Sequence, residues 1–328
     1  MHIGCLKVKP LLSRKHFKPF DFPFCYNAYV HSESMHWLPQ EIKMEEDIKD
    51  WQVKLSSDEK EFLTQIFRFF TQADVEVCGY YNQLAMILQL PEINLMVSSF
   101  QNREAIHIEA YSLLINSLNL PESEFKAFLE YKAITDKFDE LNNFSLIKEH
   151  ITPFDLLESI AIFSGFVEGL QLFSAFAMLL NFQRQGKMKG MCQIVAWSIL
   201  DETYHSNSMI KLYNELKKHF TGQFDQKMLE DRIYNTVLKM IAHEDVFIDS
   251  CFKNFVFADL DSNSIKIYVR YLAQERLKAL EIYKSIPLAP EKTPLPWFDT
   301  IARAPAFTNF FEGKPIEYSK GQMKGDWE

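Results

Sequence analysis

The chain has 328 residues, of which 47% are hydrophobic, and its formal net charge is −9 at pH 7. Such a length is enough to bury one large core, and only 10 glycines provide too few turn signals for an all-β fold. The negative charge and the lack of a basic run argue against a nucleic-acid partner, because phosphates require clustered lysine and arginine. Five scattered cysteines without a C-x-x-C pattern favour a reducing, cytoplasmic compartment.

The first 53 residues are rich in proline and aromatic side chains and are predicted to form an extended N-terminal arm that packs on a helical body. Glu33 and His36 lie three residues apart in this arm, but no sustained helical period surrounds them. We interpret this pair as local structure. Residues 1–24 lack the continuous apolar stretch of a signal peptide.

A long helix is predicted from the capping pair Ser56 and Glu59 to about residue 90. Asp74 lies on its apolar face, whereas Glu76 is two residues further on and points nearly opposite. We therefore select Asp74 as the functional carboxylate of this helix.

The next helix is predicted over about 92–119 and carries Glu104 and His107 on its apolar face. Glu109 is two residues beyond His107, so it is predicted to face solvent. A shorter helical stretch is expected over about 122–141.

Thr152 and Pro153 have the residue types of a helix start, and the helix that follows carries Glu168. Residues 161–181 are long and apolar enough to cross a bilayer. However, Glu168 and Gln171 lie in the middle of this stretch and would be costly in lipid. We predict a helix buried inside the protein and no membrane span.

The last predicted bundle helix spans about 187–219 and carries Glu202 and His205. Amphipathic segments at about 224–257 and 263–284 are expected to pack around the bundle. The run His243 to Asp245 is rich in ligand-type side chains but has no matching partner, so we assign it no function.

The two Glu-x-x-His pairs are the main functional signal in the chain. Residues three apart share a helix face, so each pair directs a carboxylate and an imidazole to one point. Two such pairs, with one carboxylate from each of two further helices, make the ligand set of a dinuclear metal site in a four-helix bundle. The chain has one complete set: Asp74, Glu104, His107, Glu168, Glu202 and His205.

Burial explains why metal ions are expected at these residues. Each residue alone could be an ordinary core histidine or a solvated carboxylate, but four carboxylates together in an apolar core require positive charge. Two divalent cations would supply this charge. The predicted cofactor is a pair of metal ions, and carboxylate and imidazole ligands suit both iron and manganese.

Tyr111 connects this site to possible radical chemistry. It lies four residues beyond His107 and seven beyond Glu104, so its ring is predicted on the same helix face, one turn from the metals. A buried tyrosine is ordinarily a core residue with a hydrogen-bonded hydroxyl. Beside an O₂-reactive metal pair it could instead lose an electron and a proton.

Several sequence motifs resemble the small, radical-generating subunit of class I ribonucleotide reductase over nearly the whole chain. They are EAIHIEAY at 104–111, FVEG at 166–169, LDETYH at 200–205, HWLPQEI at 36–42, TPLPW at 293–297 and FFEGKPIEYSK at 310–320. The resemblance implies an all-α, ferritin-like four-helix bundle with flanking helices and a flexible C-terminal tail. The expected division is an arm at 1–53, a dimetal helical domain at 54–286 and a partner-binding segment at 287–328.

The resemblance also implies roles for residues outside the metal ligands. Trp37 would lie on the electron path, and Asp201 would link it to a metal-bound histidine, as a carboxylate that orients the imidazole. In the tail, Tyr318 would pass the radical toward the large subunit, and Glu312 would be an acidic residue that assists.

The function implied is that of the small subunit of ribonucleoside-diphosphate reductase, which supplies a radical to the catalytic large subunit through the tail. A homodimer is expected from the same resemblance. Two alternatives remain open: a ferritin-like oxidase or monooxygenase with a substrate of its own, and a metal-storage or purely structural helical protein. Both alternatives predict that the tail is dispensable.

Overall fold

The computed structural model describes residues 9–127, 135, 137, 139 and 141–302. In this part of the chain almost all regular structure is helical. The strands found there are β1 (Leu12–Ser13) and β2 (Leu88–Gln89), which form a short parallel pair. The prediction of an all-α fold is confirmed.

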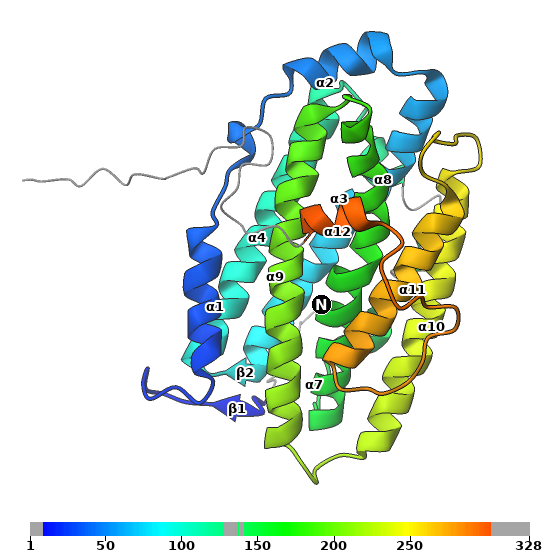
Figure 1. Ribbon diagram of the computed structural model, residues 1–328. Helices are drawn as coiled ribbons and strands as arrows, with labels where there is room; N and C mark the ends of the chain where they lie inside the picture. Colours follow the sequence, from blue (N-terminus) through cyan, green and yellow to red (C-terminus); the bar gives the residue numbers. More distant parts are fainter. Residues whose placement is uncertain (1–8, 128–134, 136, 138, 140, 303–328) are drawn as a thin grey trace, which may run out of the picture.

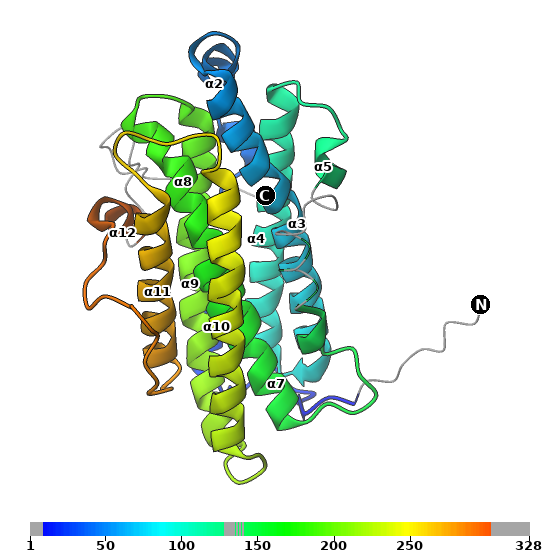
Figure 2. The same ribbon diagram turned by 90° about the vertical axis from the view of Figure 1, so that its right-hand side faces the viewer.

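Long helical segments lie side by side along the long axis of the molecule and form its centre (Figure 1, Figure 2). They are α3 (Ser57–Ile87), α4 (Pro91–Ser117), α9 (Lys189–His219) and one continuous stretch made of α7 (Pro153–Ile160), the π-helix η5 (Ala161–Gln171) and α8 (Leu172–Arg184). Helix α3 packs on α4, and α9 packs on both η5 and α8. These segments form the predicted four-helix bundle.

The flanking helices are α10 (Gln226–Cys251), α11 (Ser262–Ala279) and the short α12 (Pro296–Ala302). Helices α10 and α11 pack on each other and against η5, while α12 lies against α9. Figure 2 shows α10 and α11 beside the bundle. The segments expected to pack around the bundle therefore do so.

The helix containing Glu168 is buried on all sides. Residues 153–184 form the one stretch in the described chain that is long and apolar enough to cross a membrane, and its apolar window is 100% buried inside the protein. The prediction of a buried core helix is confirmed.

The helix starts follow the capping residues in the sequence. Ser56 accepts a hydrogen bond from the Glu59 amide, and the Glu59 side chain accepts one from the Ser56 amide. Thr152 and Asp155 form the same reciprocal pair at the start of α7. Each pair satisfies amides that the first helical turn leaves without a partner.

Two of the flanking helices end earlier than their sequence pattern indicates. Helix α10 stops at Cys251, and the chain then turns so that Phe255 and Phe257 pack against Phe62, with ring centroids 5.2 Å away in both cases. Helix α11 stops at Ala279, where Glu281 takes a positive φ and the following amide bonds back to the helix. Tertiary packing thus sets these ends.

The stretch predicted as helical at about 122–141 is described only in part. It contains α5 (Glu124–Ala127), and the chain continues after residue 141 with the 3-10 turn η4 (Asn142–Phe144). The remainder of that predicted helix falls largely outside the described residues.

The N-terminal arm carries more helix than its sequence pattern indicates. It contains α1 (Pro23–Ser34), the 3-10 turn η1 (Pro39–Glu41), α2 (Glu45–Lys49) and the π-helical turn η2 (Asp50–Lys54). Helix α1 lacks an amphipathic period and is held by its contacts with α4.

The Glu33 and His36 pair, interpreted above as local structure, takes part in these contacts. Ser99 donates to Glu33, and the fully buried Arg103 donates to the backbone carbonyl of Ser32 and contacts His36 Nδ1 at 2.9 Å. Glu33 and His36 therefore connect the N-terminal arm to α4, and they lie outside the cluster formed by the other two Glu-x-x-His pairs.

Two aspartates of the arm cap the start of α9. Asp47 accepts hydrogen bonds from the amides of Gly190 and Met191, and Asp50 accepts one from the amide of Met188. The negative carboxylates also lie at the positive end of the α9 dipole, where they are stabilising. At Gly190 an added Cβ would lie 2.7 Å from the carbonyl oxygen of Lys43.

We predict that Gly190→Ala destabilises the protein by about 1–3 kcal/mol, because the new methyl group must push backbone atoms apart. Thermal unfolding of the purified protein would measure this as a lower midpoint. Gly79→Ala in α3 is the matched control, because nothing lies within 4 Å of its added Cβ. There the loss of glycine flexibility should leave the midpoint unchanged or raise it. Equal midpoints for the two variants would contradict the proposed close contact.

Candidate metal centre

Six side chains converge at the centre of the bundle, and none of them is more than 1% exposed. Helix α3 and η5 contribute one each, while α4 and α9 contribute two each. They are Asp74, Glu104, His107, Glu168, Glu202 and His205. The structure therefore brings together every residue that the sequence analysis selected as a metal ligand.

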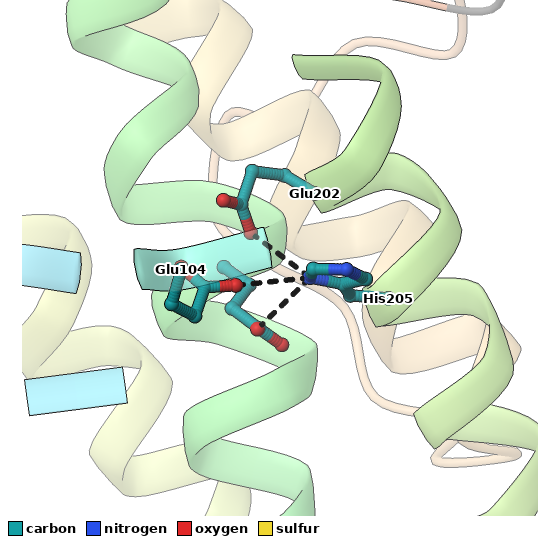
Figure 3. A group of neighbouring side chains, drawn as sticks. Glu104, Glu202 and His205 are labelled. Atoms are coloured by element: carbon teal, nitrogen blue, oxygen red, sulfur yellow. Dashed lines mark ion pairs between the residues drawn. The ribbon is translucent and has the colours of Figure 1, made fainter. Parts of the chain in front are cut away.

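The first half of the cluster surrounds His205. Its Nδ1 lies 3.1 Å from Glu104 Oε1, 3.6 Å from Glu168 Oε1 and 3.8 Å from Glu202 Oε2. Figure 3 shows the carboxylates of Glu104 and Glu202 directed at the same nitrogen of His205. Ligand atoms from all four residues lie within 4.8 Å of one another, which is close enough to hold one ion.

The second half surrounds His107. Its Nδ1 lies 3.0 Å from Glu202 Oε1, 3.6 Å from Glu104 Oε2 and 3.9 Å from Asp74 Oδ2. Glu104 and Glu202 thus direct one oxygen to each histidine. This geometry gives two adjacent half-sites that share two carboxylates.

Most ligand-type atoms in the cluster lack ordinary hydrogen bonds. Both carboxylate oxygens of Asp74, Glu104 and Glu202, and Nδ1 of both histidines, have no hydrogen-bond partner among the described residues. Buried polar atoms are rarely left in this state, because each costs free energy. A cation between them would satisfy these atoms at once.

Burial shifts the pKa values of the clustered carboxylates. Burial raises the pKa of Asp74 well above its ordinary value, and the charge of Glu104 adds to the shift. Burial also raises the pKa of Glu168, and it raises the pKa of Glu202 to about 8. Burial would raise the pKa of Glu104 as well, but its contacts with the two histidines outweigh this and lower it.

The pKa values of the two histidines are raised, whereas burial alone would lower them. Burial lowers the pKa of both, but contacts with carboxylates outweigh it, so the pKa of His107 is well above its usual value and that of His205 is raised to about 10. In the absence of cations the imidazoles therefore take up protons to balance the carboxylates.

The segment carrying Glu168 has the wide hydrogen-bonding pattern of a π-helix, which is frequent at functional sites. Gly169 follows Glu168, and a Cβ there would lie 2.6 Å from Ser206 Oγ and 2.7 Å from Arg276 Nε. Arg276 instead donates to the carbonyl oxygen of Gly169 at 3.2 Å. Glycine thus lets α9 and α11 approach beside the cluster.

Asp201 connects the cluster to the N-terminal arm. Its Oδ2 accepts a hydrogen bond from Trp37 Nε1 at 2.9 Å and lies 3.2 Å from His107 Nε2. The Trp37 ring stacks on that of His107 with centroids 5.8 Å apart, and its centroid lies 5.2 Å from that of Trp197. Trp37, Asp201 and His107 therefore form one buried chain.

Tyr111 lies on α4 and is 3% exposed. Burial raises its pKa well above the ordinary value, and the nearby charge of Asp74 contributes. Its hydroxyl is therefore protonated and close to the His107 half of the cluster.

The rejected candidates lie outside the cluster. Glu109 is exposed, as predicted, and accepts a hydrogen bond from Gln40. Glu76 is half-buried and belongs to neither group of ligand-type side chains, so Asp74 is the α3 carboxylate that reaches the cluster. Glu312 and Tyr318 lie outside the described residues.

Two interactions were missed in the sequence analysis. Glu244, for which no partner was found, is fully buried and pairs with Lys137 at 2.5 Å. Tyr81 donates a hydrogen bond to Glu168 Oε1 at 2.7 Å. The sequence signal for Tyr81 was its position seven residues after Asp74, on the same helix face. The partner of Glu244 is distant in sequence, so no local pattern indicates that pair.

The chain matches the family model described as "Ribonucleotide reductase, small chain" over residues 14–292. It is 41% identical to the probable ribonucleoside-diphosphate reductase small subunit 048L of Invertebrate iridescent virus 3, over 98% of this chain and 88% of that protein.

Solved structures show the same fold. The ribonucleotide reductase R2 subunit from Clostridium botulinum superposes with a TM-score of 0.80 at 20% identity, over 88% of this chain and 91% of that one. The dimanganese(II)-NrdF of Streptococcus sanguinis gives a TM-score of 0.74 at 17% identity, over 88% and 99%. These neighbours confirm the predicted ferritin-like bundle. The chain therefore belongs to the small-chain family of ribonucleotide reductase and takes part in ribonucleotide reduction as the small subunit of that oxidoreductase.

Proposed function

We propose that the six clustered residues bind two metal ions and that the site generates a radical, stored on Tyr111, for ribonucleotide reduction by a large subunit. The observation that carries this proposal is that Glu104 and Glu202 each direct one oxygen to His107 and the other to His205. Four carboxylates would neutralise two divalent cations, and two imidazole Nδ1 atoms complete the donor set.

Bound iron or manganese would supply the oxidising equivalent by reaction with O₂ or a derived oxidant. The ligand types suit both metals and do not select one. Iron is our first assignment, and manganese or a mixed pair is the alternative. The Streptococcus sanguinis neighbour is described as a dimanganese protein, which supports keeping manganese open.

The surrounding side chains would control where the oxidising equivalent goes. Asp201 accepts from Trp37 and contacts His107 Nε2, so it would hold the imidazole with Nδ1 directed at the cation. Tyr111 would give up its electron and its hydroxyl proton within a buried environment that excludes water.

Transfer to the large subunit would use residues at two places in the chain. Trp37 stacks on His107 and is joined to it by hydrogen bonds through Asp201. Tyr318 and Glu312 belong to the C-terminal tail, which lies outside the described residues. We propose that this tail binds the large subunit and that the chain forms a homodimer in the cytoplasm.

We predict that Tyr111→Phe leaves folding and metal content unchanged but removes the tyrosyl radical. Metal quantification and electron paramagnetic resonance after aerobic reconstitution would test this. Tyr213→Phe removes another buried hydroxyl, 0% exposed on α9, and should retain the radical. An unchanged radical spectrum in Tyr111→Phe would rule out the assignment of Tyr111.

We also predict that metal binding stabilises the protein more at pH 8 than at pH 6. In the cation-free protein the pKa values of Glu202 and His205 are raised to about 8 and about 10. A raised folded-state pKa contributes stability that is lost as pH rises through it, so the cation-free protein weakens on going from pH 6 to 8. Between pH 6 and pH 8 cations would also compete with fewer protons for the carboxylates and imidazoles of the cluster.

The measurement is the thermal unfolding midpoint with and without Mn²⁺ under anaerobic conditions at the two pH values. Glu109→Gln, which removes an exposed carboxylate of the same helix, should keep the wild-type difference. A metal-induced shift of equal size at pH 6 and pH 8 would contradict the proposed exchange of protons for cations.

Deletion of residues 312–328 should leave metal loading and the radical signal intact but abolish ribonucleotide reduction in a mixture with the large subunit. Tyr318→Phe should still bind the large subunit, measured by co-sedimentation, and should also be inactive. A truncated chain that turned over a substrate without a partner would favour the alternative of an independent oxidase or monooxygenase.

A further inference from the structure

Tyr81 contacts the cluster at a position that the ligand set does not include. It lies on α3, is 0% exposed, and donates a hydrogen bond from its hydroxyl to Glu168 Oε1 at 2.7 Å. Its ring meets that of His205 edge-on, with centroids 6.2 Å apart. Tyr81 is therefore in direct contact with the His205 half of the cluster.

The two half-sites differ in how their ligands are held. In the His107 half, the imidazole Nε2 contacts Asp201, and both oxygens of Asp74 are without hydrogen-bond partners among the described residues. In the His205 half, Nε2 has no hydrogen-bond partner among the described residues, and the ring stacks on Phe100 at 4.2 Å. In this half, the hydrogen bond from outside the cluster is made to the Glu168 carboxylate and not to the His205 imidazole.

We propose that Tyr81 is a positioning residue for the cation held by Glu168 and His205. The inference rests on the proposed dinuclear site. The hydrogen bond from the Tyr81 hydroxyl fixes the rotation of the Glu168 carboxylate and keeps it turned toward His205 Nδ1, from which Oε1 lies 3.6 Å away.

The strength of this effect follows from the setting of the hydrogen bond. A tyrosine hydroxyl is protonated at neutral pH and is a permanent donor to a carboxylate. The bond is buried, so water cannot replace it when it is removed. Removal of a hydrogen-bond partner of a metal ligand typically lowers metal affinity by about 10–100-fold.

The test is an anaerobic Mn²⁺ titration in which the six-line electron paramagnetic resonance signal counts free ions. The wild type should bind two ions. Tyr81→Phe should bind one ion with wild-type affinity and the other about 10–100-fold more weakly. Two ions bound with wild-type affinity, or both weakened equally, would overturn the role of Tyr81.

Tyr80→Phe is the matched control. Tyr80 is the adjacent residue, is 1% exposed, and stacks its ring on Phe163 at 4.3 Å and 2°. Its substitution removes a buried hydroxyl outside the ligand-type groups and should leave both affinities unchanged. A loss in Tyr80→Phe equal to that in Tyr81→Phe would show a general packing effect and overturn the proposal.

A double-mutant cycle tests whether Tyr81 acts through Glu168. Glu168→Ala removes the carboxylate that accepts from Tyr81, so it should weaken binding of the same ion. Adding Tyr81→Phe to this variant should then lower the affinity for that ion by much less than Tyr81→Phe does in the wild type. Independent, additive losses would overturn the proposal. A wild type that binds no ion pair would instead refute the proposed function, and this inference with it.

Discussion

The structure depends on the need to balance four buried carboxylates. Two other fully buried acids in the described chain have a basic side chain beside them: Glu92 pairs with Arg14, and Glu244 pairs with Lys137. The four carboxylates of the cluster face two histidines instead, which carry charge only when protonated. Because an uncompensated buried charge costs several kcal/mol, such an arrangement persists only if cations or protons occupy it. The choice of histidine over arginine or lysine is what leaves room for metal ions.

The residues around the cluster link its position to the N-terminal arm. Arg103 precedes Glu104 of the cluster and contacts His36, which precedes Trp37. Trp37 in turn donates to Asp201, the residue before Glu202 of the cluster. Helices α4 and α9 are thus each tied to the arm through the residue that precedes their clustered glutamate. A shift of the arm would move Trp37 relative to His107, so helix packing and the proposed electron path are coupled.

The sequence allowed the six-residue cluster to be predicted because helical spacing alone brings Glu104 to His107 and Glu202 to His205. The apolar faces of the helices also showed which carboxylates point inward. Asp74 was separated from Glu76 by the same reasoning. The helices of the arm were harder to predict, since α1 is stabilised by Ser32, Glu33 and His36 contacting a helix more than sixty residues away. The Tyr81 to Glu168 bond and the pairing of Glu244 are also contacts between distant segments, which no local period encodes.

The burial of the cluster explains why the proposed radical chemistry would act at a distance. All six ligand-type side chains are at most 1% exposed and Tyr111 is 3% exposed, so a ribonucleotide could not touch them without unpacking the bundle. An electron and a proton, unlike a nucleotide, can move through packed side chains joined by hydrogen bonds. The chain from His107 through Asp201 to Trp37 is such a connection, and it leads from the cluster to the arm. A site that excludes substrate but retains an outlet for an electron suits a small subunit that serves a separate catalytic chain.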